Sequence, residues 1–224
     1  MNRSDVYLGI DTSGETFSLA LLRGERLLGE ITGGTPRQHL VQLFPALDSL
    51  CRQSDFQLQQ LRGVAVTRGP GSFTGVRSGL LVARTLAQSL GCELFPVDTL
   101  EALACNALEG SAVVPALDAR KGQICWAQYR VCWGQPVLLE PARLSSAEEF
   151  VSALPAQARV LGSACQSYRA ALEQAGVTQL PESTWPVRAT QVARLAVLGL
   201  AAPVRWQRTR PEYVRPADVQ VHSS

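Results

Sequence analysis

The chain has 224 residues, of which 46% are hydrophobic and 18% charged, and its formal net charge is +2. This length gives one large domain or two small ones, and this charge gives no general attraction to nucleic acid or membranes. No apolar run approaches the roughly 18 residues of a membrane span, the six cysteines form no CxxC pair, and the only histidines are His39 and His222. We therefore expect a cytoplasmic protein with reduced thiols, no contact with a membrane, no bound metal and no cofactor.

The first half of the chain alternates short apolar runs with helical patterns. Runs at 6–13, 16–23 and 26–32 are joined by tight glycine-containing turns, which predicts an antiparallel meander. Apolar residues at helical spacing over 37–53 predict a helix, and Pro45 inside it is expected to kink or split it. Alternating strands and helices are then expected at 62–69, 73–90, 93–98 and 99–108.

The meander pattern then starts again at residue 112. Strands are expected at 112–120, 122–131 and 135–141, followed by a helix, a strand and two helices at 145–154, 158–163, 164–176 and 189–202. In both "IDTSGE" (10–15) and "LDARKGQ" (117–123), an apolar strand ends in Asp and leads into a glycine-containing turn. We infer an internal duplication and predict an α/β fold of two mixed sheets, with one lobe over 1–110 and a smaller one over 111–224.

A glycine-rich stretch, "RGPGSFTG" (68–75), leads into the helix expected at 73–90. It matches neither the GxxxxGK[ST] nor the GxGxxG phosphate-binding pattern, because it has no lysine and its glycine spacing is one residue too long. The helix carries small side chains at every fourth position, with Leu80 beside this stripe: Gly75, Gly79, Ala83 and Ala87. Such a stripe permits close packing within one chain or against a second subunit, and the spacing alone does not separate these alternatives.

Two strand ends carry carboxylates that suit magnesium and phosphate binding. Asp11 is followed by Thr12 and Ser13, and Asp118 ends the corresponding strand of the second meander. In the superfamily of actin, sugar kinases and chaperone ATPases, two such turns face each other across a nucleotide, and these four residues form our candidate vestigial nucleotide site. The alternative interpretation is that they simply form turns.

Other kinds of chemistry receive less support from the residues. The two histidines lie where no hydrolase triad can be assembled, so no catalytic residue is assigned. The stretch "RWQRTRPEYVR" (205–215) interleaves arginines with aromatic residues, which is typical either of a solvated tail or of a segment that touches RNA. The alternative function is a small magnesium-dependent ATPase or phosphotransferase that uses Asp11 and Asp118, and a metallopeptidase is the third interpretation.

Several stretches together resemble the bacterial TsaB (YeaZ) family. The resemblance is carried by "LGIDTSGETFSLALL", "GPGSFTGVRSGLLVARTLA", "FPVDTLEALA", "ALDARKGQICWAQY" and the late "PEYVR". It covers most of the chain and is weakest between about residues 140 and 205. It implies a two-lobed actin-like (ASKHA, ribonuclease H-like) fold with a reduced second lobe.

The resemblance also implies a function. Members of this family are accessory, non-catalytic subunits needed to form N6-threonylcarbamoyladenosine in tRNAs that read codons starting with A. They form a heterodimer with the catalytic paralogue TsaD, are joined by the ATPase TsaE, contact tRNA through the complex, and form homodimers when alone. The implied subunit contact uses two helices, with Leu40, Leu43 and Leu47 on the first and Gly75, Gly79, Leu80, Ala83 and Ala87 on the second. On this assignment, Gly79→Leu is expected to break association and leave the monomer folded.

One departure from the catalytic paralogue is informative. That paralogue carries an "NHLEGH" segment whose two histidines bind the metal, and Thr99 and Leu103 occupy the matching positions of this chain. Neither side chain replaces imidazole as a ligand of a transition metal. The residues therefore predict that the metal site of the paralogue is lost here.

Overall fold

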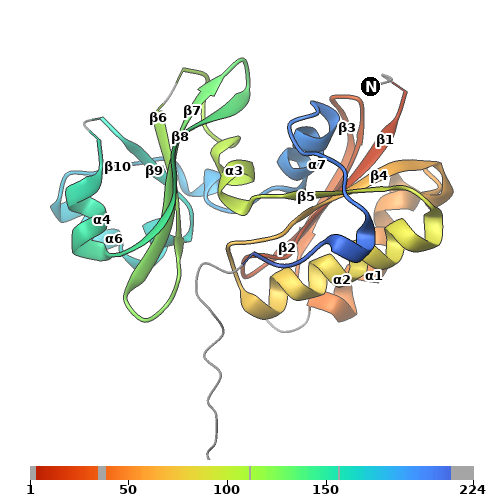
Figure 1. Ribbon diagram of the computed structural model, residues 1–224, viewed down its shortest axis with the longest axis horizontal. Helices are drawn as coiled ribbons and strands as arrows, with labels where there is room; N and C mark the ends of the chain where they lie inside the picture. The colour runs from red at the N-terminus through yellow and green to blue at the C-terminus, as the bar shows by residue number, and fades with distance from the viewer. Residues whose placement is uncertain (1–3, 35–38, 111, 156, 213–224) are drawn as a thin grey trace, which may run out of the picture.

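The structure is a computed structural model that describes residues 4–34, 39–110, 112–155 and 157–212. Two five-stranded mixed sheets stand side by side (Figure 1). The first sheet has the order β3-β2-β1-β4-β5, with β1 (Val6–Asp11), β2 (Phe17–Arg23), β3 (Arg26–Gly33), β4 (Leu61–Thr67) and β5 (Glu93–Val97). β1 pairs antiparallel with β2 and parallel with β4, and β2 pairs antiparallel with β3. The predicted meander is therefore confirmed.

Helices cover both faces of the first sheet. α1 (His39–Gln53) and α2 (Phe73–Leu90) lie on one face, and α7 (Ala189–Val197) packs on the other. Successive residues of β1 alternate between these faces: Leu8 and Ile10 join the cluster under α1 and α2, and Tyr7 joins the cluster under α7. A strand covered on both sides reads as a continuous apolar run, which is how β1 appears in the sequence.

The second sheet repeats the first. Its order is β10-β9-β6-β7-β8, with β6 (Ala112–Asp118), β7 (Gln123–Cys132), β8 (Gln135–Ser146), β9 (Arg159–Leu161) and β10 (Thr178–Gln179). Read from β8 to β10, it matches the first sheet strand for strand and direction for direction. The duplication and the fold class are confirmed, and the second sheet is the reduced one because β9 and β10 have only three and two residues.

Short helices complete the second half. α3 (Thr99–Ala104) lies between the sheets, and α4 (Ala147–Ala153), α5 (Ser163–Ser167) and α6 (Arg169–Gln174) belong to the second sheet (Figure 1). The described residues also form the 3-10 turns η1 (Leu58–Gln60), η2 (Glu182–Thr184) and η3 (Trp206–Arg208). No helix of the described residues is both long and apolar enough to cross a membrane.

Some element boundaries differ from those expected. Pro45 does not split α1, which is one continuous helix. β8 continues to Ser146, where a loop and a helix start were expected, because its pairing with β7 extends to the Gln123–Ser146 pair. The helix expected over 164–176 is divided at Tyr168, whose backbone angles (φ −121°, ψ 22°) leave the helical region.

α7 comes late in the chain but belongs to the first sheet. Its first backbone amides donate hydrogen bonds to two neighbouring strands: Ala189 N to Ser18 Oγ (3.0 Å) and Thr190 N to Glu30 Oε1 (3.1 Å). Arg188, just before the helix, pairs with the Glu30 carboxylate. The division of the chain at residue 110 stays a prediction, and the packing of α7 means that the first lobe includes late residues.

Glu30→Gln is expected to lower the free energy of unfolding by about 1–2 kcal/mol at neutral pH, since it removes the charge that holds the half-exposed Arg188. Burial raises the pKa of Glu30, but hydrogen bonds from Arg188 and Thr190 outweigh it and hold the pKa below its usual 4.5. A lowered pKa stabilises the fold above the unfolded-state pKa, and this stabilisation is lost as the pH falls through the folded-state pKa. Urea unfolding at about pH 7 and pH 3.5 checks this, and an equal deficit of the variant at both values would contradict it.

Candidate functional site

The end of β1 is tied to β4 and to the turn that follows it. The buried Asp11 carboxylate accepts hydrogen bonds at Oδ1 from Thr67 Oγ1 (2.7 Å), Ser13 Oγ (2.7 Å) and Ser13 N (3.2 Å). Thr12 is fully buried, and its Oγ1 donates to the Gly75 carbonyl (2.8 Å) at the start of α2. Three of the four residues predicted for the nucleotide site therefore lie together. Their side chains form hydrogen bonds with neighbouring residues of the same chain.

The glycines just before α2 and in its first two turns allow this segment to lie close to the end of β1. A Cβ at Gly71 would lie 2.7 Å from the Ser13 carbonyl, and one at Gly75 would lie 2.0 Å from the Thr12 carbonyl. A Cβ at Gly79 would lie 2.2 Å from Thr12 Oγ1. These separations exclude any side chain, so the glycines let the loop and the first two turns of α2 pack onto the end of β1. Ser72, whose Oγ accepts from Gly75 N (3.2 Å), caps the helix.

The small-residue stripe of α2 faces the core of its own chain. Ala83 and Ala87 are buried like the two glycines. The same holds for three leucines predicted at the subunit contact, Leu43, Leu47 and Leu80, whereas the side chain of Leu40 lies outside the described residues. Their placement corrects the expectation for Gly79→Leu, because a leucine here would collide with Thr12 inside the monomer. That α1 and α2 carry a subunit contact stays a prediction.

The outer sides of α1 and α2 expose large apolar residues that the sequence analysis did not assign to the subunit contact. Val41, Phe44, Phe73 and Leu81 are 77%, 50%, 42% and 58% exposed. We call these four residues, with the groove described next, the α1–α2 face. The sequence signal that could have revealed them is an apolar residue next to the inward-facing stripe of a helix. Val41 and Phe44 are next to the inward-facing leucines of α1 in this way.

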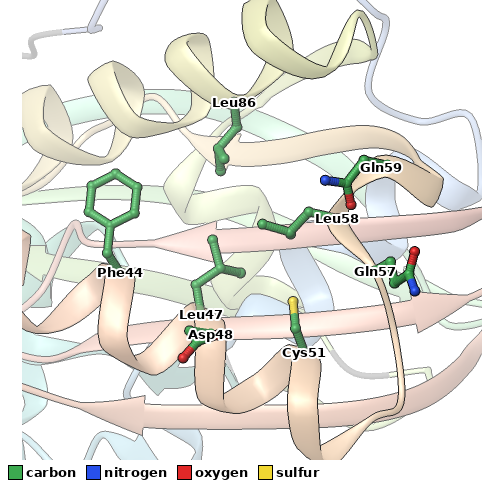
Figure 2. A pocket seen from close by; sticks show the side chains of 8 residues that line it. All are labelled: Phe44, Leu47, Asp48, Cys51, Gln57, Leu58, Gln59 and Leu86. Carbon is green, nitrogen blue, oxygen red and sulfur yellow. The ribbon is translucent and has the colours of Figure 1, made fainter.

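A groove of about 370 Å³ runs between α1, η1 and α2 (Figure 2). Leu47, Leu58 and Leu86 make it apolar, and Phe44 and Asp48 project from α1 beside it. Gln57 and Gln59 add amide groups on the η1 side. An apolar groove bordered by amide and carboxylate groups suits an inserted apolar side chain with polar neighbours.

Asp118, the fourth predicted nucleotide-site residue, ends β6 at the position that Asp11 has on β1. Its carboxylate accepts hydrogen bonds from Arg120 N (2.8 Å) and Ser167 Oγ (2.9 Å), and the Arg120 guanidinium lies 3.7 Å away. These partners lie in the turn between β6 and β7 and in α5. The structure thus groups Asp11, Thr12 and Ser13 with α2, and groups Asp118 with α5.

α3 turns Thr99 and Leu103, the two residues predicted to match the histidines of the paralogue, into the core between the sheets. Thr99 and Leu103 are both fully buried, and Leu103 packs in one cluster with Tyr129 of β7 and residues of α7. Within the described residues, no three His, Cys, Asp or Glu side chains are grouped so as to hold a metal ion.

An acidic residue on α3 has an unusual titration. Burial and, to a smaller extent, the charge of Asp98 at the helix N-terminus together raise the pKa of Glu101 to about 7, against the opposing charge of Arg68. Asp98 is held in place because its carboxylate accepts a hydrogen bond from Glu101 N (3.0 Å) and caps α3. Glu101 therefore takes up a proton in the folded chain near neutral pH.

Glu101→Gln is expected to stabilise the chain by about 1–2 kcal/mol at pH 8 and to be neutral near pH 4, after a discount for the solvent contact of this half-buried group. Because the folded-state pKa is raised above the unfolded one, the folded state binds more protons between the ordinary 4.5 and about 7. The stability of the natural chain therefore falls as the pH rises through this window. Thermal unfolding of both chains between these pH values checks this. A difference in unfolding temperature that does not change with pH would contradict a proton uptake by Glu101.

The family profile of tRNA N6-adenosine threonylcarbamoyltransferase (TsaD) matches residues 31–212. The tRNA threonylcarbamoyladenosine biosynthesis protein TsaB of Bacillus subtilis is 40% identical over 124 residues, which is 55% of this chain and 54% of that protein. TsaB of Escherichia coli is 34% identical over 126 residues, 55% of this chain and 54% of that protein. The chain thus spans about half the length of these curated relatives.

Solved structures extend the likeness over nearly the whole chain. YeaZ from Pseudomonas aeruginosa superposes with a TM-score of 0.80 at 27% identity, covering 93% of this chain and 99% of that chain. The activator of 2-hydroxyisocaproyl-CoA dehydratase from Clostridium difficile has a TM-score of 0.54 at 10% identity, covering 87% and 95%. The second likeness shows a shared fold alone.

Proposed function

Because the chain belongs to the tRNA N6-adenosine threonylcarbamoyltransferase family, and within it to the TsaB (YeaZ) group, we propose that it takes part in forming threonylcarbamoyladenosine in tRNA. In this proposal it acts as a non-catalytic subunit that binds a TsaD-type catalytic paralogue. A TsaE-type ATPase joins the pair, and tRNA is bound by the complex. Without the paralogue, the chain pairs with a second copy of itself.

The observation that carries this proposal is the α1–α2 face. Four large apolar side chains stand exposed on two neighbouring helices, and one of them, Phe44, also lines the groove of about 370 Å³. An apolar groove with large exposed apolar side chains on the helices that form it is typical of a surface that contacts another protein. A paralogue of the same fold presents comparable helices, so the contact is a packing of two helices from each partner.

A non-catalytic role is supported by the residues on α3. Thr99 and Leu103 offer no nitrogen, sulfur or carboxylate ligand to a transition metal, and both are packed between the two sheets. The carboxylates of Asp11 and Asp118 take part in hydrogen bonds with neighbouring residues of the chain. They contribute to the fold whether or not a nucleotide is present.

An omission assay tests the proposal. Threonylcarbamoyl transfer to tRNA is measured with a TsaD-type paralogue, a TsaE-type ATPase and the enzyme that supplies the threonylcarbamoyl-adenylate, with and without this chain. We expect transfer to fall at least about tenfold when the chain is omitted, which corresponds to about 1.4 kcal/mol, and expect no transfer by the chain alone.

Unchanged transfer on omission would overturn the proposal. The alternative, a small magnesium-dependent ATPase, is measured with the chain alone. It predicts ATP turnover that Asp11→Asn abolishes in a variant that remains folded, and the proposed function predicts no such turnover.

A further inference from the structure

The segment after α7 returns along the first lobe and is fastened at several points. Val204 N donates to the Leu94 carbonyl of β5 (2.8 Å), and the half-buried Trp206 packs against the core under α2. At its far end, Glu212 N donates to the Arg68 carbonyl (2.7 Å), and the two side chains pair at 3.0 Å. We call residues 203–212 the C-terminal strap; Figure 1 shows it in blue, passing α2 and β5.

The strap presents three arginines to solvent. Arg205, Arg208 and Arg210 are exposed, and none of them forms an ion pair with a residue that the structure describes. Arginine elsewhere is mostly paired, as in Arg52, Arg62, Arg68, Arg120, Arg143, Arg169, Arg188 and Arg194. Arg208 ends η3, and Arg205 immediately precedes that turn as its N-cap, so both are held on backbone that is fixed to the first lobe.

The surface beside the first of these arginines mixes polar and apolar residues. An open groove of about 470 Å³ lies beside Arg205, between the strap and the start of β5. The acid that lines it, Glu93, is paired with Arg62 (3.1 Å), so it does not neutralise Arg205. The apolar residues of the strap, Val204 and Trp206, are half-buried against the first lobe. The strap therefore offers positive charge without an exposed apolar anchor.

We propose that the C-terminal strap binds the sugar–phosphate backbone of RNA through Arg205, Arg208 and Arg210. Protein interfaces need apolar or aromatic anchors at their centre, whereas phosphate contacts need guanidinium groups held on a fixed backbone. Arginine is suited to this because its fork of N–H donors matches two phosphate oxygens. The choice of RNA rests on the proposed function, which brings tRNA to the complex.

The test is the binding of an unmodified tRNA transcript to the full chain over a range of salt concentrations. The triple variant Arg205→Gln, Arg208→Gln, Arg210→Gln is expected to bind at least about tenfold more weakly at 0.1 M salt. The slope of its plot of log affinity against log salt concentration should be smaller in magnitude by about 2.7, because each lost phosphate contact lowers that slope by about 0.9. All three side chains are exposed, so the midpoint of thermal unfolding should not change.

A matched control removes the same charge elsewhere. Arg23, Arg26 and Arg130 are also exposed and outside the ion pairs described above, and their triple change to Gln is expected to leave tRNA binding within about twofold. An equal loss in both variants would mean that only net charge matters and would overturn the proposal. So would binding of a polyglutamate peptide as tight as that of tRNA, which would identify an acidic protein as the partner.

The omission assay separates this proposal from the proposed function. If omission abolishes modification but the strap variant binds tRNA like the natural chain, the accessory role stands and the strap proposal fails. If the strap variant loses tRNA binding but omission has no effect, the RNA contact stands and the proposed function fails.

Discussion

Gly79→Ala is expected to lower the free energy of unfolding by about 2 kcal/mol, although glycine to alanine inside a helix ordinarily stabilises by about 1 kcal/mol. The added Cβ would lie 2.2 Å from Thr12 Oγ1, which is itself bonded to the Gly75 carbonyl. The oxygen can leave only by breaking that buried bond. Either result, collision or a broken bond, destabilises the contact between α2 and the end of β1.

A second substitution isolates the cause. In a Thr12→Ala background, Gly79→Ala is expected to be neutral or slightly stabilising, because the next nearest atoms are the Cβ of residue 12 at 3.5 Å and Val66 Cγ2 at 3.6 Å, which are ordinary contact distances. Thr12→Ala alone should lose about 1 kcal/mol with its hydrogen bond. The two changes are therefore expected to couple by about 2–3 kcal/mol.

Gly75→Ala provides the comparison. Its Cβ would lie 2.0 Å from the backbone carbonyl of Thr12, which no side-chain substitution at residue 12 removes. This variant is expected to lose about 3 kcal/mol or more, with no rescue by Thr12→Ala. Urea unfolding of the single and double variants measures these effects, with Gln88→Ala on the exposed side of α2 as the control. A stabilising Gly79→Ala in the natural background would show that this contact is not tight.

The repeated meanders could be predicted from the sequence because their signals are local. Tight turns between short apolar runs set the pairing of neighbouring strands, and the shared "D…G" turn linked Asp11 to Asp118. The end of β8 could not be predicted in this way, since residues 142–146 are held as a strand only by pairing with β7. The return of α7 to the first sheet is likewise set by distant partners, Ser18 and Glu30.

At the candidate site too, the sequence predicted a pattern but not the distant residues that it meets. The spacing of Gly75 and Gly79 predicted a close approach, which the structure confirms, but it left the partner open, and the partner is Thr12 rather than another helix. Helical spacing likewise located the apolar stripe of α1 without saying which side meets water. Leu43 and Phe44 both fit that spacing, but Phe44 is half-exposed at the groove, whereas Leu43 is buried.

Phe44→Glu is expected to weaken both self-association of the chain and its binding to a TsaD-type paralogue by about 100-fold, which corresponds to about 3 kcal/mol. The ring stands half-exposed at the groove between α1 and α2, where a partner side chain would cover it. A carboxylate there would be buried without a partner charge when the complex forms. Leu81→Glu on the outer side of α2 should act in the same direction. Sedimentation of the chain alone and titration calorimetry with the paralogue measure both effects.

Two control variants decide whether the effect belongs to the α1–α2 face. Leu108 and Leu138 are exposed at least as fully as Phe44 but lie outside α1 and α2, the first between α3 and β6 and the second on β8, and Leu108→Glu and Leu138→Glu should leave association within about twofold. All four substitutions fall on exposed side chains, so each variant should unfold at the same temperature as the natural chain. If the controls weaken association as much as Phe44→Glu, the contact lies outside the α1–α2 face. If no variant weakens it, the apolar residues of α1 and α2 do not meet a partner, and the accessory role has to depend on another surface.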